Sequence, residues 1–327
     1  MSIVRSGPRR EETMTCRESK VQPPAASTLG DDAEQLAREF MEQRPRLLGI
    51  AYRLLGTMWD AEDIVADAMV RWLAVDREQI REPAAFLTTM VTRRALDQLR
   101  SARVARERYA GEWLPEPVVT ERSPLDPLDT VERRESVSMA TLRMMEQLTP
   151  PERAVFVLHE AFDVPHAAIA DVLDISPASS RQHLHRARAH IGGRSRRFEP
   201  EPAEHCHLFE RFLAALESGD LDELQELLSS DAVAYSDGGG KARAARRPIA
   251  GVNAILAFFG ALRRHHTIRV DRMIEVNGQT GALLWFGQQY QLLTVDRTGD
   301  TITEIHSIMN PDKLRYLHDQ LASSQTH

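Results

Sequence analysis

Residues 148–191 read LTPPERAVFVLHEAFDVPHAAIADVLDISPASSRQHLHRARAHI. Thr149, with proline at the next position and Glu152 three residues on, is the pattern of a capping box at the start of a helix. An Asp-Val-Pro sequence breaks that helix, and a short apolar run follows at residues 166–173. Ser176, which precedes a proline, predicts the N-cap of a last helix. The stretch therefore predicts a helix, a short helix, a tight turn and a final helix.

The final helix is strongly basic, because residues 177–197 carry six arginines, three histidines and no acidic residue. A short helix, a tight turn and an acid-free basic helix match a DNA-binding helix-turn-helix, whose second helix enters the major groove. An ordinary helical hairpin is the alternative. The start of the helix should meet base edges and its later arginines should meet phosphates. The expected DNA contacts are Ser179, Arg181, Gln182, His185, Arg186 and Arg188.

An acidic amphipathic helix is predicted upstream, where residues 60–73 read DAEDIVADAMVRWL. Ile64, Ala68 and Trp72 recur at a spacing of four, which predicts a buried stripe, while carboxylates gather on another face. Asp60 is also a candidate cap of this helix. The acidic face is either a partner surface or the solvated face of a bundle helix. Its residues are Asp60, Glu62, Asp63 and Asp67.

A basic helix is predicted to start near Pro83 and to run to about Arg103. Phe86 and Leu87 belong to its apolar stripe, and several arginines are left outside. Such a row of arginines suits a phosphate track, because each neutralised phosphate releases counterions. A basic surface helix that balances the acidic helix is the alternative. The candidate DNA contacts are Arg93, Arg94, Arg100 and Arg103.

Breaks rich in proline and glycine divide the chain. Residues 110–134 hold one glycine and four prolines, and a Gly-Gly pair followed by two prolines marks a second break near residue 200. The first residues show no apolar period, which is typical of disorder. We expect a disordered tail at 1–32, domains at 33–109, 135–197 and 203–327, and a linker at 110–134.

The third domain differs from the first two because strands are predicted in it as well as helices. Helices are predicted at 203–218, 221–228 and 252–264, and strands at 232–236, 243–249, 267–276, 281–295 and 301–308. Helices followed by a sheet predict an α+β domain.

The formal net charge of −7 hides opposed segments. Residues 31–76 sum to −5 and residues 198–327 to −6, whereas residues 81–108 sum to +4 and residues 177–197 to +6. The positive charge therefore lies on the two helical segments that are predicted to meet DNA.

The composition argues against several classes of protein. No run of about 18 apolar residues exists for a membrane-spanning helix, and no apolar stretch of about 7–15 residues opens the chain as a secretory signal would. Cys16 and Cys206 form no disulfide or metal framework. We expect a cytoplasmic protein with no membrane partner, no metal and no cofactor.

The two helical modules, Leu48 through Arg103 and Leu148 through Ile191, resemble the two conserved domains of the extracytoplasmic-function (ECF) sigma factors of bacterial RNA polymerase. The resemblance implies that the acidic helix docks on the clamp helices of the polymerase's largest subunits. It also implies that the basic helix melts and reads the −10 promoter element and that the helix-turn-helix reads the −35 element. One departure is Ser180, where a small apolar core residue is more usual. Core polymerase and promoter DNA are then the partners, and the acidic segments should keep the free protein from binding DNA well.

Three motifs look like signatures of the subgroup with a fused SnoaL-like domain: Trp113-Leu-Pro-Glu-Pro117, Asp237-Gly-Gly-Gly-Lys241 and Asn310-Pro-Asp-Lys-Leu314. The implied fold is multidomain, with an all-α helical bundle, an all-α helix-turn-helix and an α+β NTF2-like domain. Such a cone has an apolar pocket that could take a small ligand. We hypothesise that the linker packs on this domain near residues 237–241 and fixes the spacing of the DNA-binding modules. The expected regulatory contacts are Trp113, Leu114, Pro115, Asp237, Gly238, Gly239, Gly240, Lys241, Asn310, Pro311, Asp312 and Lys313.

Two other functions were weighed against this hypothesis. A one-component regulator, with a ligand-sensing NTF2-like domain and an operator-binding helix-turn-helix, leaves the helices of residues 60–108 without a role. An enzyme fused to a DNA-binding module lacks a convincing acid/base pair. Asp237 is more simply explained as a cap of its own glycine loop, and His306 as a polar group of the core or of the pocket. We therefore expect an alternative sigma factor for promoter-specific initiation, with no catalytic residues.

Overall fold

The first module is a three-helix bundle of α1 (Ala26–Leu55), α2 (Met58–Leu73) and α3 (Pro83–Arg106). The computed structural model describes residues 26–76, 80–106, 108–120, 125, 136–195 and 202–324. Most of the predicted disordered tail, residues 1–25, lies outside this description. Residues 26–32 are already helical, because α1 begins at Ala26.

The amphipathic pattern of α2 correctly identifies its buried face, which includes Ile64, Ala68 and Trp72. Asp60 is not the cap, because the helix starts two residues earlier and Thr57 occupies the N-cap position. Phe86 does not join the core as predicted. It lies in the first turn of α3, where its ring covers Trp72 from outside at a centroid distance of 6.1 Å and stays partly exposed.

The second module consists of α5 (Met139–Met145), α6 (Pro150–Phe156) with its π-helical continuation η2 (Val157–Ala161), α7 (His166–Leu173) and α8 (Pro177–Ser195). The capping box of Thr149 and Glu152 is present. Ser180 is fully buried, and its hydroxyl lies 2.8 Å from Nδ1 of His166, so the core accommodates this polar residue.

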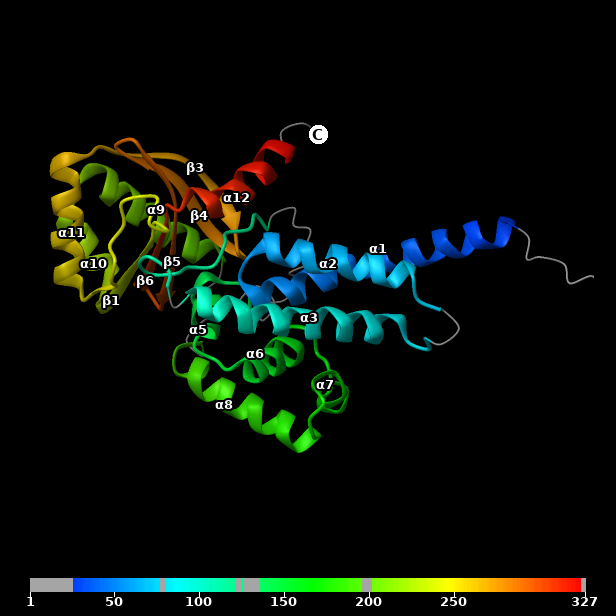
Figure 1. Cartoon of the computed structure of the whole chain (residues 1–327). Coiled ribbons are helices and arrows are strands. Elements are labelled where there is room, and N and C mark those ends of the chain that lie inside the picture. Colours follow the sequence, from blue (N-terminus) through cyan, green and yellow to red (C-terminus); the bar gives the residue numbers. More distant parts are fainter. Residues whose placement is uncertain are drawn as a thin grey trace, which may run out of the picture.

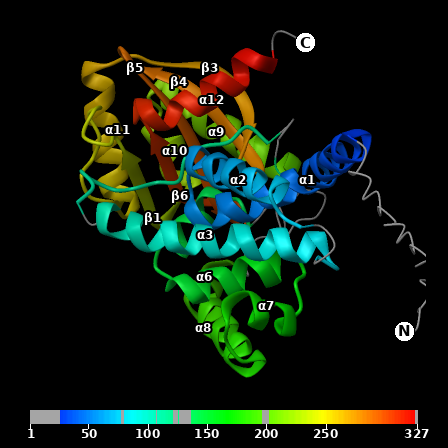
Figure 2. The ribbon, with the colours of Figure 1, turned by 45° about the vertical axis from the view of Figure 1, so that its right-hand side comes forward.

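The two helical modules share one hydrophobic core. Its buried residues include Leu96 of α3, Val155 of α6 and Ile169 of α7. Figure 2 shows α6 and α7 beneath α3, with α8 beyond them. The helix-turn-helix is therefore folded against the first bundle.

The third domain is built on a mixed sheet (Figure 1). The strand order is β2-β1-β6-β5-β4-β3, in which β1 pairs with β6 in parallel and the other neighbours are antiparallel. The elements are α9 (Pro202–Ser218), α10 (Leu221–Leu227), β1 (Leu228–Asp237), β2 (Ile249–Ala250), α11 (Val252–His265), β3 (Ile268–Val276), β4 (Gln279–Phe286), β5 (Gln289–Thr298), β6 (Thr301–Ile308) and α12 (Pro311–Ser324).

Two layers cover the sheet. Helices α9, α10 and α11 cover one face through a cluster that includes Phe209, Phe212 and Leu293. A second cluster on the other face joins Leu114 of the linker, Met139 of α5 and Leu317 of α12 to the strands. The sheet is therefore the surface on which the sigma-like modules dock.

Two strand predictions are wrong. Of residues 243–249 only the last belongs to a strand, because the stretch follows a triple glycine and contains an Arg-Arg-Pro sequence whose proline cannot donate to a ladder. The run 281–295 is a hairpin that turns at Gly287, where φ is +59°. Within the described residues, no helix combines the length and the apolar character that crossing a membrane requires.

Candidate functional site

The carboxylate of Asp237 lies at the end of β1, fully buried, at the meeting point of three segments. It accepts hydrogen bonds from the Tyr109 hydroxyl at 2.6 Å and from the Leu114 backbone N–H at 2.9 Å. Nζ of Lys313, on α12, lies 2.6 Å from the same carboxylate. The prediction that Asp237 caps its own loop is wrong, because its partners come from the linker and from α12.

Lys313 is the buried cation of this group. Its Nζ also donates to the Leu114 carbonyl and lies 4.1 Å from the centre of the Trp113 ring. Burial lowers the pKa of Lys313 to about 8, although Asp237 works in the opposite direction. The pair is neutral as a whole and shielded from water, so each charge depends on the other.

The glycine motif allows this close approach. Gly239 and Gly240 have φ of +58° and +71°, which L side chains rarely adopt. A Cβ on Gly239 would lie 2.3 Å from Nδ2 of Asn310 and 3.0 Å from the Tyr109 hydroxyl. Asn310 caps α12 by accepting the Asp312 backbone N–H at 3.1 Å, and its Nδ2 donates to the Tyr109 hydroxyl at 2.8 Å.

The three motifs are therefore brought together by the fold. Leu114 and Pro115 of the linker are buried, Pro311 begins α12, and Lys241 forms an exposed ion pair with Asp312. Gly238 must also lack a side chain, because a Cβ there would clash with the Ala242 carbonyl oxygen. Their regulatory role stays a prediction.

Trp113 connects the linker to the first bundle. The guanidinium of Arg106 lies 3.8 Å from the ring centre. A Cβ on Gly56, where φ is +71°, would lie 2.6 Å from the ring, so glycine makes room for the indole. The aromatic side chain is thus covered by the end of α1, by α3 and by Lys313.

Glu116, the fourth residue of the linker motif, caps α2 from outside that helix. Its carboxylate accepts the backbone N–H groups of Met58 and of Trp59, the latter at 3.3 Å. The Glu116 backbone N–H donates to the Gly56 carbonyl at 2.8 Å. Burial raises the pKa of Glu116 to about 7, and the two backbone N–H groups oppose this shift. A negative charge at a helix N-terminus is favourable, but the burial of Glu116 makes its charged form unfavourable.

Asn277 is a second connecting residue, and the sequence reasoning missed it. With Gly278 it forms the β3–β4 turn, both residues at positive φ. Its buried Nδ2 donates to the Tyr52 hydroxyl at 2.6 Å and to the Val137 carbonyl at 2.9 Å, and its Oδ1 accepts the Val118 N–H at 3.1 Å. The Asn-Gly dipeptide signals a hairpin turn in sequence, but nothing in it signals these partners.

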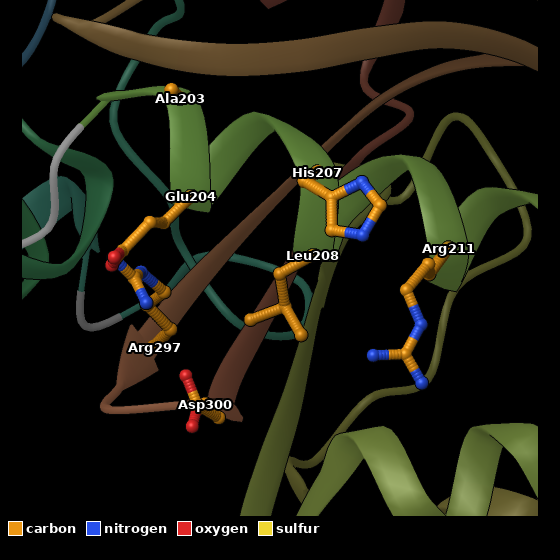
Figure 3. Close-up of a pocket in the computed structure, with 7 residues that line it drawn as sticks. All are labelled: Ala203, Glu204, His207, Leu208, Arg211, Arg297 and Asp300. Carbon is orange, nitrogen blue, oxygen red and sulfur yellow. The ribbon is translucent and has the colours of Figure 1, made fainter.

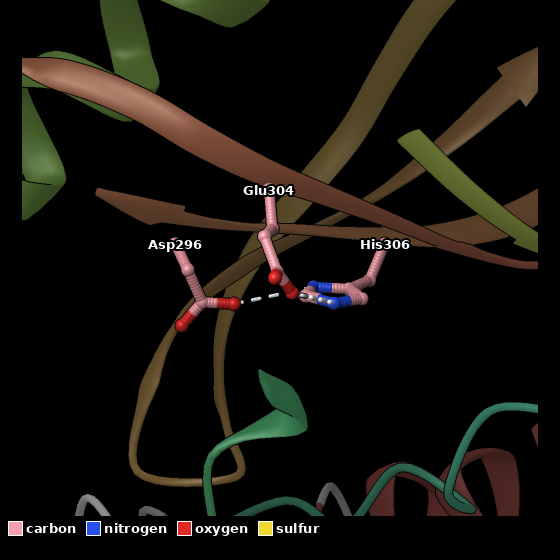
Figure 4. A group of neighbouring side chains, drawn as sticks. All are labelled: Asp296, Glu304 and His306. Atoms are coloured by element: carbon pink, nitrogen blue, oxygen red, sulfur yellow. Dashed lines mark ion pairs between the residues drawn. The ribbon is translucent and has the colours of Figure 1, made fainter. Parts of the chain in front are cut away.

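A buried ionic network joins the sheet to α5. Figure 4 shows the three residues that the sheet contributes, Asp296, Glu304 and His306. The two ring nitrogens of His306 lie 3.2 Å from Asp296 and 3.2 Å from Glu304. Both carboxylate oxygens of Glu304 also accept hydrogen bonds from Nη2 of Arg143, at 2.8 and 2.7 Å. Burial works to lower the pKa of His306, but the two carboxylates outweigh it and raise the pKa.

These side chains are also of the kinds that bind divalent metals. However, Glu304 is already neutralised by Arg143, and each nitrogen of His306 faces a different carboxylate. His306 and Arg143 hold the pKa of Glu304 at about 2 against the effect of burial. We interpret the group as an ion-pair network between the domain and the second module.

A hollow of about 370 Å³ lies between α9 and the β5–β6 turn (Figure 3). Arg297 extends toward Glu204, with which it forms an ion pair at 2.8 Å, and Asp300 lies below them. Its charged lining differs from the apolar pocket that the sequence predicts. The residues around it are Ala203, Glu204, His207, Leu208, Arg211, Arg297 and Asp300.

The acidic candidates on α2 divide into two groups. Asp63 and Asp67 are exposed, whereas Asp60 and Glu62 are half-buried. The hydroxyl of Tyr316, on α12, donates to Glu62 at 3.0 Å. The last helix of the chain therefore reaches the helix predicted to bind polymerase.

The arginines of α3 also divide into one that contacts another helix and others that are exposed. Arg93 donates to the carbonyls of Val172 at 2.8 Å and Asp171 at 3.1 Å, in the last turn of α7. Arg94 is exposed, and Arg100 is exposed with an ion pair to Asp97. The side chain of Arg103 lies outside the described residues.

The base-reading candidates on α8 face outward. Arg181, Gln182 and His185 are exposed. Ser179 is half-buried, and its backbone N–H donates to the Ser176 hydroxyl at 3.0 Å. The phosphate candidates are engaged within the module, Arg186 with Glu152 at 2.9 Å and Arg188 with Glu160 at 2.6 Å.

Comparison with known proteins assigns each part of the chain. Family models match residues 40–104 as sigma-70 region 2, residues 138–191 as sigma-70 region 4 and residues 209–305 as a SnoaL-like domain. The predicted fold class is confirmed: helical sigma regions precede an α+β domain with a six-strand mixed sheet.

Two curated proteins of Mycobacterium tuberculosis are similar over most of the chain. The ECF RNA polymerase sigma factor SigJ is 39% identical over 288 residues, which cover 84% of this chain and 92% of SigJ. The probable ECF RNA polymerase sigma factor SigI is 31% identical, over 88% of this chain and 98% of SigI. A crystal structure of SigJ matches with a TM-score of 0.71 at 35% identity, covering 86% of this chain and 98% of that one.

Asp237→Asn should strongly destabilise the docked linker, because it leaves the Lys313 ammonium buried without its counter-charge. We expect a loss of about 3–5 kcal/mol of unfolding free energy, measured by urea denaturation. Asp312→Asn is the matched control, since its pair with Lys241 is exposed and should be worth less than about 1 kcal/mol. Equal losses in the two variants would contradict the central role of Asp237.

Glu116→Gln should change the pH dependence of stability. The pKa of about 7 in the folded protein lies above the usual 4.5, so the native state holds its proton more tightly than the unfolded chain. This contribution is present below pH 4.5 and is lost as the pH rises through 7. The urea midpoint of the wild type should therefore fall relative to the glutamine variant between pH 5 and pH 8. Parallel curves for the two proteins would show that Glu116 does not titrate in this way.

Proposed function

The chain belongs to the ECF RNA polymerase sigma factors, and on this premise we propose that its fused domain holds the sigma regions in a closed arrangement that core polymerase opens. Region 2 and region 4 are the parts that engage polymerase and promoter DNA in this family. Sigma factors are not enzymes, and the function is to direct promoter-specific initiation in the cytoplasm. The finer part of the proposal is modulation by the SnoaL-like domain.

The observation that carries the closed arrangement of the two sigma regions is the contact of Arg93 with α7. Arg93 belongs to the helix proposed to hold the −10 element, and its guanidinium is occupied by carbonyls of the helix-turn-helix. The two carbonyls take Nε and Nη2, which together form one bidentate edge of the guanidinium, so this edge cannot bind a DNA phosphate at the same time. Region 4 therefore competes with DNA for a residue of region 2.

The length of a promoter supports the same conclusion. The −10 and −35 elements are about 25 base pairs apart, which is roughly 85 Å along a duplex at about 3.4 Å per base pair. Here α3 touches α7 directly. Simultaneous binding of both elements requires α8, with Arg181 and Gln182, to move away from α3.

The exposed face of α2 is the first contact surface that we propose for core polymerase. Asp63, Asp67 and Val70 recur at helical spacing on α2 and are exposed, Val70 to 70%. Next to them Trp59 meets the ring of Tyr316 at 5.4 Å, and Glu62 accepts the Tyr316 hydroxyl. We propose that the clamp helices bind the exposed part of this face and then displace α12 from Glu62.

The remaining site assignments follow from this scheme. Arg94, Arg100 and Arg103 would join Arg93 at the −10 element once α7 has left. Arg186 and Arg188 would exchange their intramolecular carboxylates for phosphates, whereas Ser179 and His185 would face bases. Mapping transcription starts after overexpression supplies the promoter on which these roles are tested.

A small ligand of the fused domain stays a prediction. The charged hollow at Arg211 and Arg297 is where a polar effector would be sought, by titration of the purified protein with metabolite pools. A one-component regulator would instead bind duplex DNA without polymerase. The exposed acidic face of α2 favours the sigma factor, because such a regulator has no use for it.

Reversing two charges tests the polymerase contact. Asp63→Arg with Asp67→Arg should weaken binding to core polymerase more than about tenfold, because like charges then face the clamp surface. The readout is a pull-down with purified core polymerase, followed by a titration. Asp222→Arg with Glu226→Arg, an exposed pair at the same spacing on α10, should bind as the wild type does. Retained binding by the first variant would exclude this docking face.

Removing the contact of α12 tests the closed arrangement. Tyr316→Ala should tighten binding to core polymerase by up to about tenfold, which is the effect of about 1.4 kcal/mol of lost competition. Arg315→Ala, an exposed neighbour on the same helix, should leave it unchanged. Chains ending at residue 309 or at residue 199 should also alter promoter-dependent transcription. An unchanged affinity of Tyr316→Ala, together with unaltered transcription from both truncations, would contradict regulation by the fused domain.

A further inference from the structure

The fused domain carries a segment of unusual charge. Residues 238–270 contain seven lysines and arginines and no aspartate or glutamate, although residues 198–327 as a whole sum to −6. The first part of the segment is the loop of residues 241–248 between β1 and β2, and the second is the end of α11. Positive charge is therefore segregated on an otherwise acidic domain.

The loop lies beside the end of α3. A Cβ on Gly240 would lie 3.1 Å from Ala110, and a Cβ on Gly111 would lie 3.8 Å from Cα of Arg246. Ala110 and Gly111 follow α3 within five residues of its end at Arg106. The loop thus lies next to the C-terminal end of the helix that carries the −10 arginines.

The loop arginines are exposed and available. Lys241 is paired with Asp312, but no ion pair connects Arg243, Arg246 or Arg247 to a carboxylate within the described part of the chain. The Arg243 carbonyl accepts Nε2 of Gln289 at 3.0 Å, which fixes the loop on the sheet. Three exposed guanidinium groups therefore lie within a stretch of five residues, with no carboxylate paired to them among the residues that the structure describes.

The end of α11 extends the same surface. Nδ1 of His266 would lie 2.9 Å from a Cβ on Gly287, in the turn that precedes Gln289. Arg264 and His265 are exposed beside it. The loop and the helix end therefore meet the β4–β5 turn from two sides.

We infer that Arg243, Arg246 and Arg247 bind phosphates of the promoter duplex next to the −10 element, so that the fused domain is itself a DNA-binding part of the open complex. The inference rests on the proposed function, because α3 must lie on DNA for the loop to reach it. Guanidinium groups match phosphate geometry, and each neutralised phosphate adds affinity through counterion release.

The contact should carry no sequence information of its own. The arginines lie on irregular backbone rather than on a helix or ribbon that could enter the major groove. Phosphate contacts position a protein on the duplex and act on every sequence alike. The adjoining α3, which already presents Arg94 and Arg100, favours DNA over an acidic protein partner.

The test uses the full chain bound to core polymerase and a fluorescent promoter duplex from the transcription-start map. Arg246→Gln with Arg247→Gln should lower the slope of log affinity against log salt by about 2, since each lost phosphate contact contributes about 0.9. At about 0.15 M salt we expect roughly tenfold weaker binding by the same principle. Arg246→Lys with Arg247→Lys should retain the wild-type slope, because it keeps both charges.

Arg272→Gln with Arg315→Gln is the charge-matched control elsewhere on the domain, because both arginines are exposed and lie outside the loop, and it should leave the slope unchanged. An unchanged slope in the loop variant would overturn the inference. So would an equal change in the control, which would indicate net charge alone, or a loss of core polymerase binding, which would indicate a protein partner. If wild-type holoenzyme fails to bind the promoter at all, the proposed function fails and the inference with it.

Discussion

A buried ion pair between Asp237 and Lys313 is the constraint on which the arrangement of this molecule depends. Asp237 joins the end of β1 to a linker residue 123 positions away and to a helix 76 positions away. Neither charge can be left alone in a dry interior. Because the linker also places Glu116 at the start of α2 and Trp113 against Gly56, the same pair orients the first bundle against the domain.

The interface between the two sigma regions and the interface between these regions and the sheet differ in chemistry. The two sigma regions share an apolar core, yet Arg93 meets α7 through polar groups alone. The joint to the sheet combines an apolar cluster with the Arg143–Glu304–His306 network and the amide of Asn277. Contacts between parts of a chain separate more readily where polar groups accompany the apolar ones, as they do here. Hydrogen bonds to water and to nucleic acid can replace the internal partners when the parts move.

The fused domain keeps its own apolar core on one side of the sheet and presents its docking surface on the other. The space between helices and sheet is occupied by Phe209, Phe212 and their neighbours, whereas the opposite sheet face binds the linker, α5 and α12. Its value to the protein therefore lies in its surfaces. Fold alone does not determine function, and here the docking face and the cationic loop are the informative parts.

The sequence by itself determined the local structure and the family. The capping box at Thr149, the buried stripe of α2 and the turn before Pro177 depend on residues within four positions of one another, so spacing is enough to predict them. The three motifs marked the linker, the glycine loop and the last helix as special, and the family resemblance supplied roles for α2, α3 and α8.

Only the tertiary structure decided which groups are partners across long separations. The sequence alone predicts that Asp237 caps its own loop and that Arg93 contacts DNA, and it gives no sign of the partners of Asn277. In each case the partner lies far along the chain, and its direction depends on the packing of whole elements. A single sequence records the side chain that needs a partner, but the partner is chosen by the fold that buries them together.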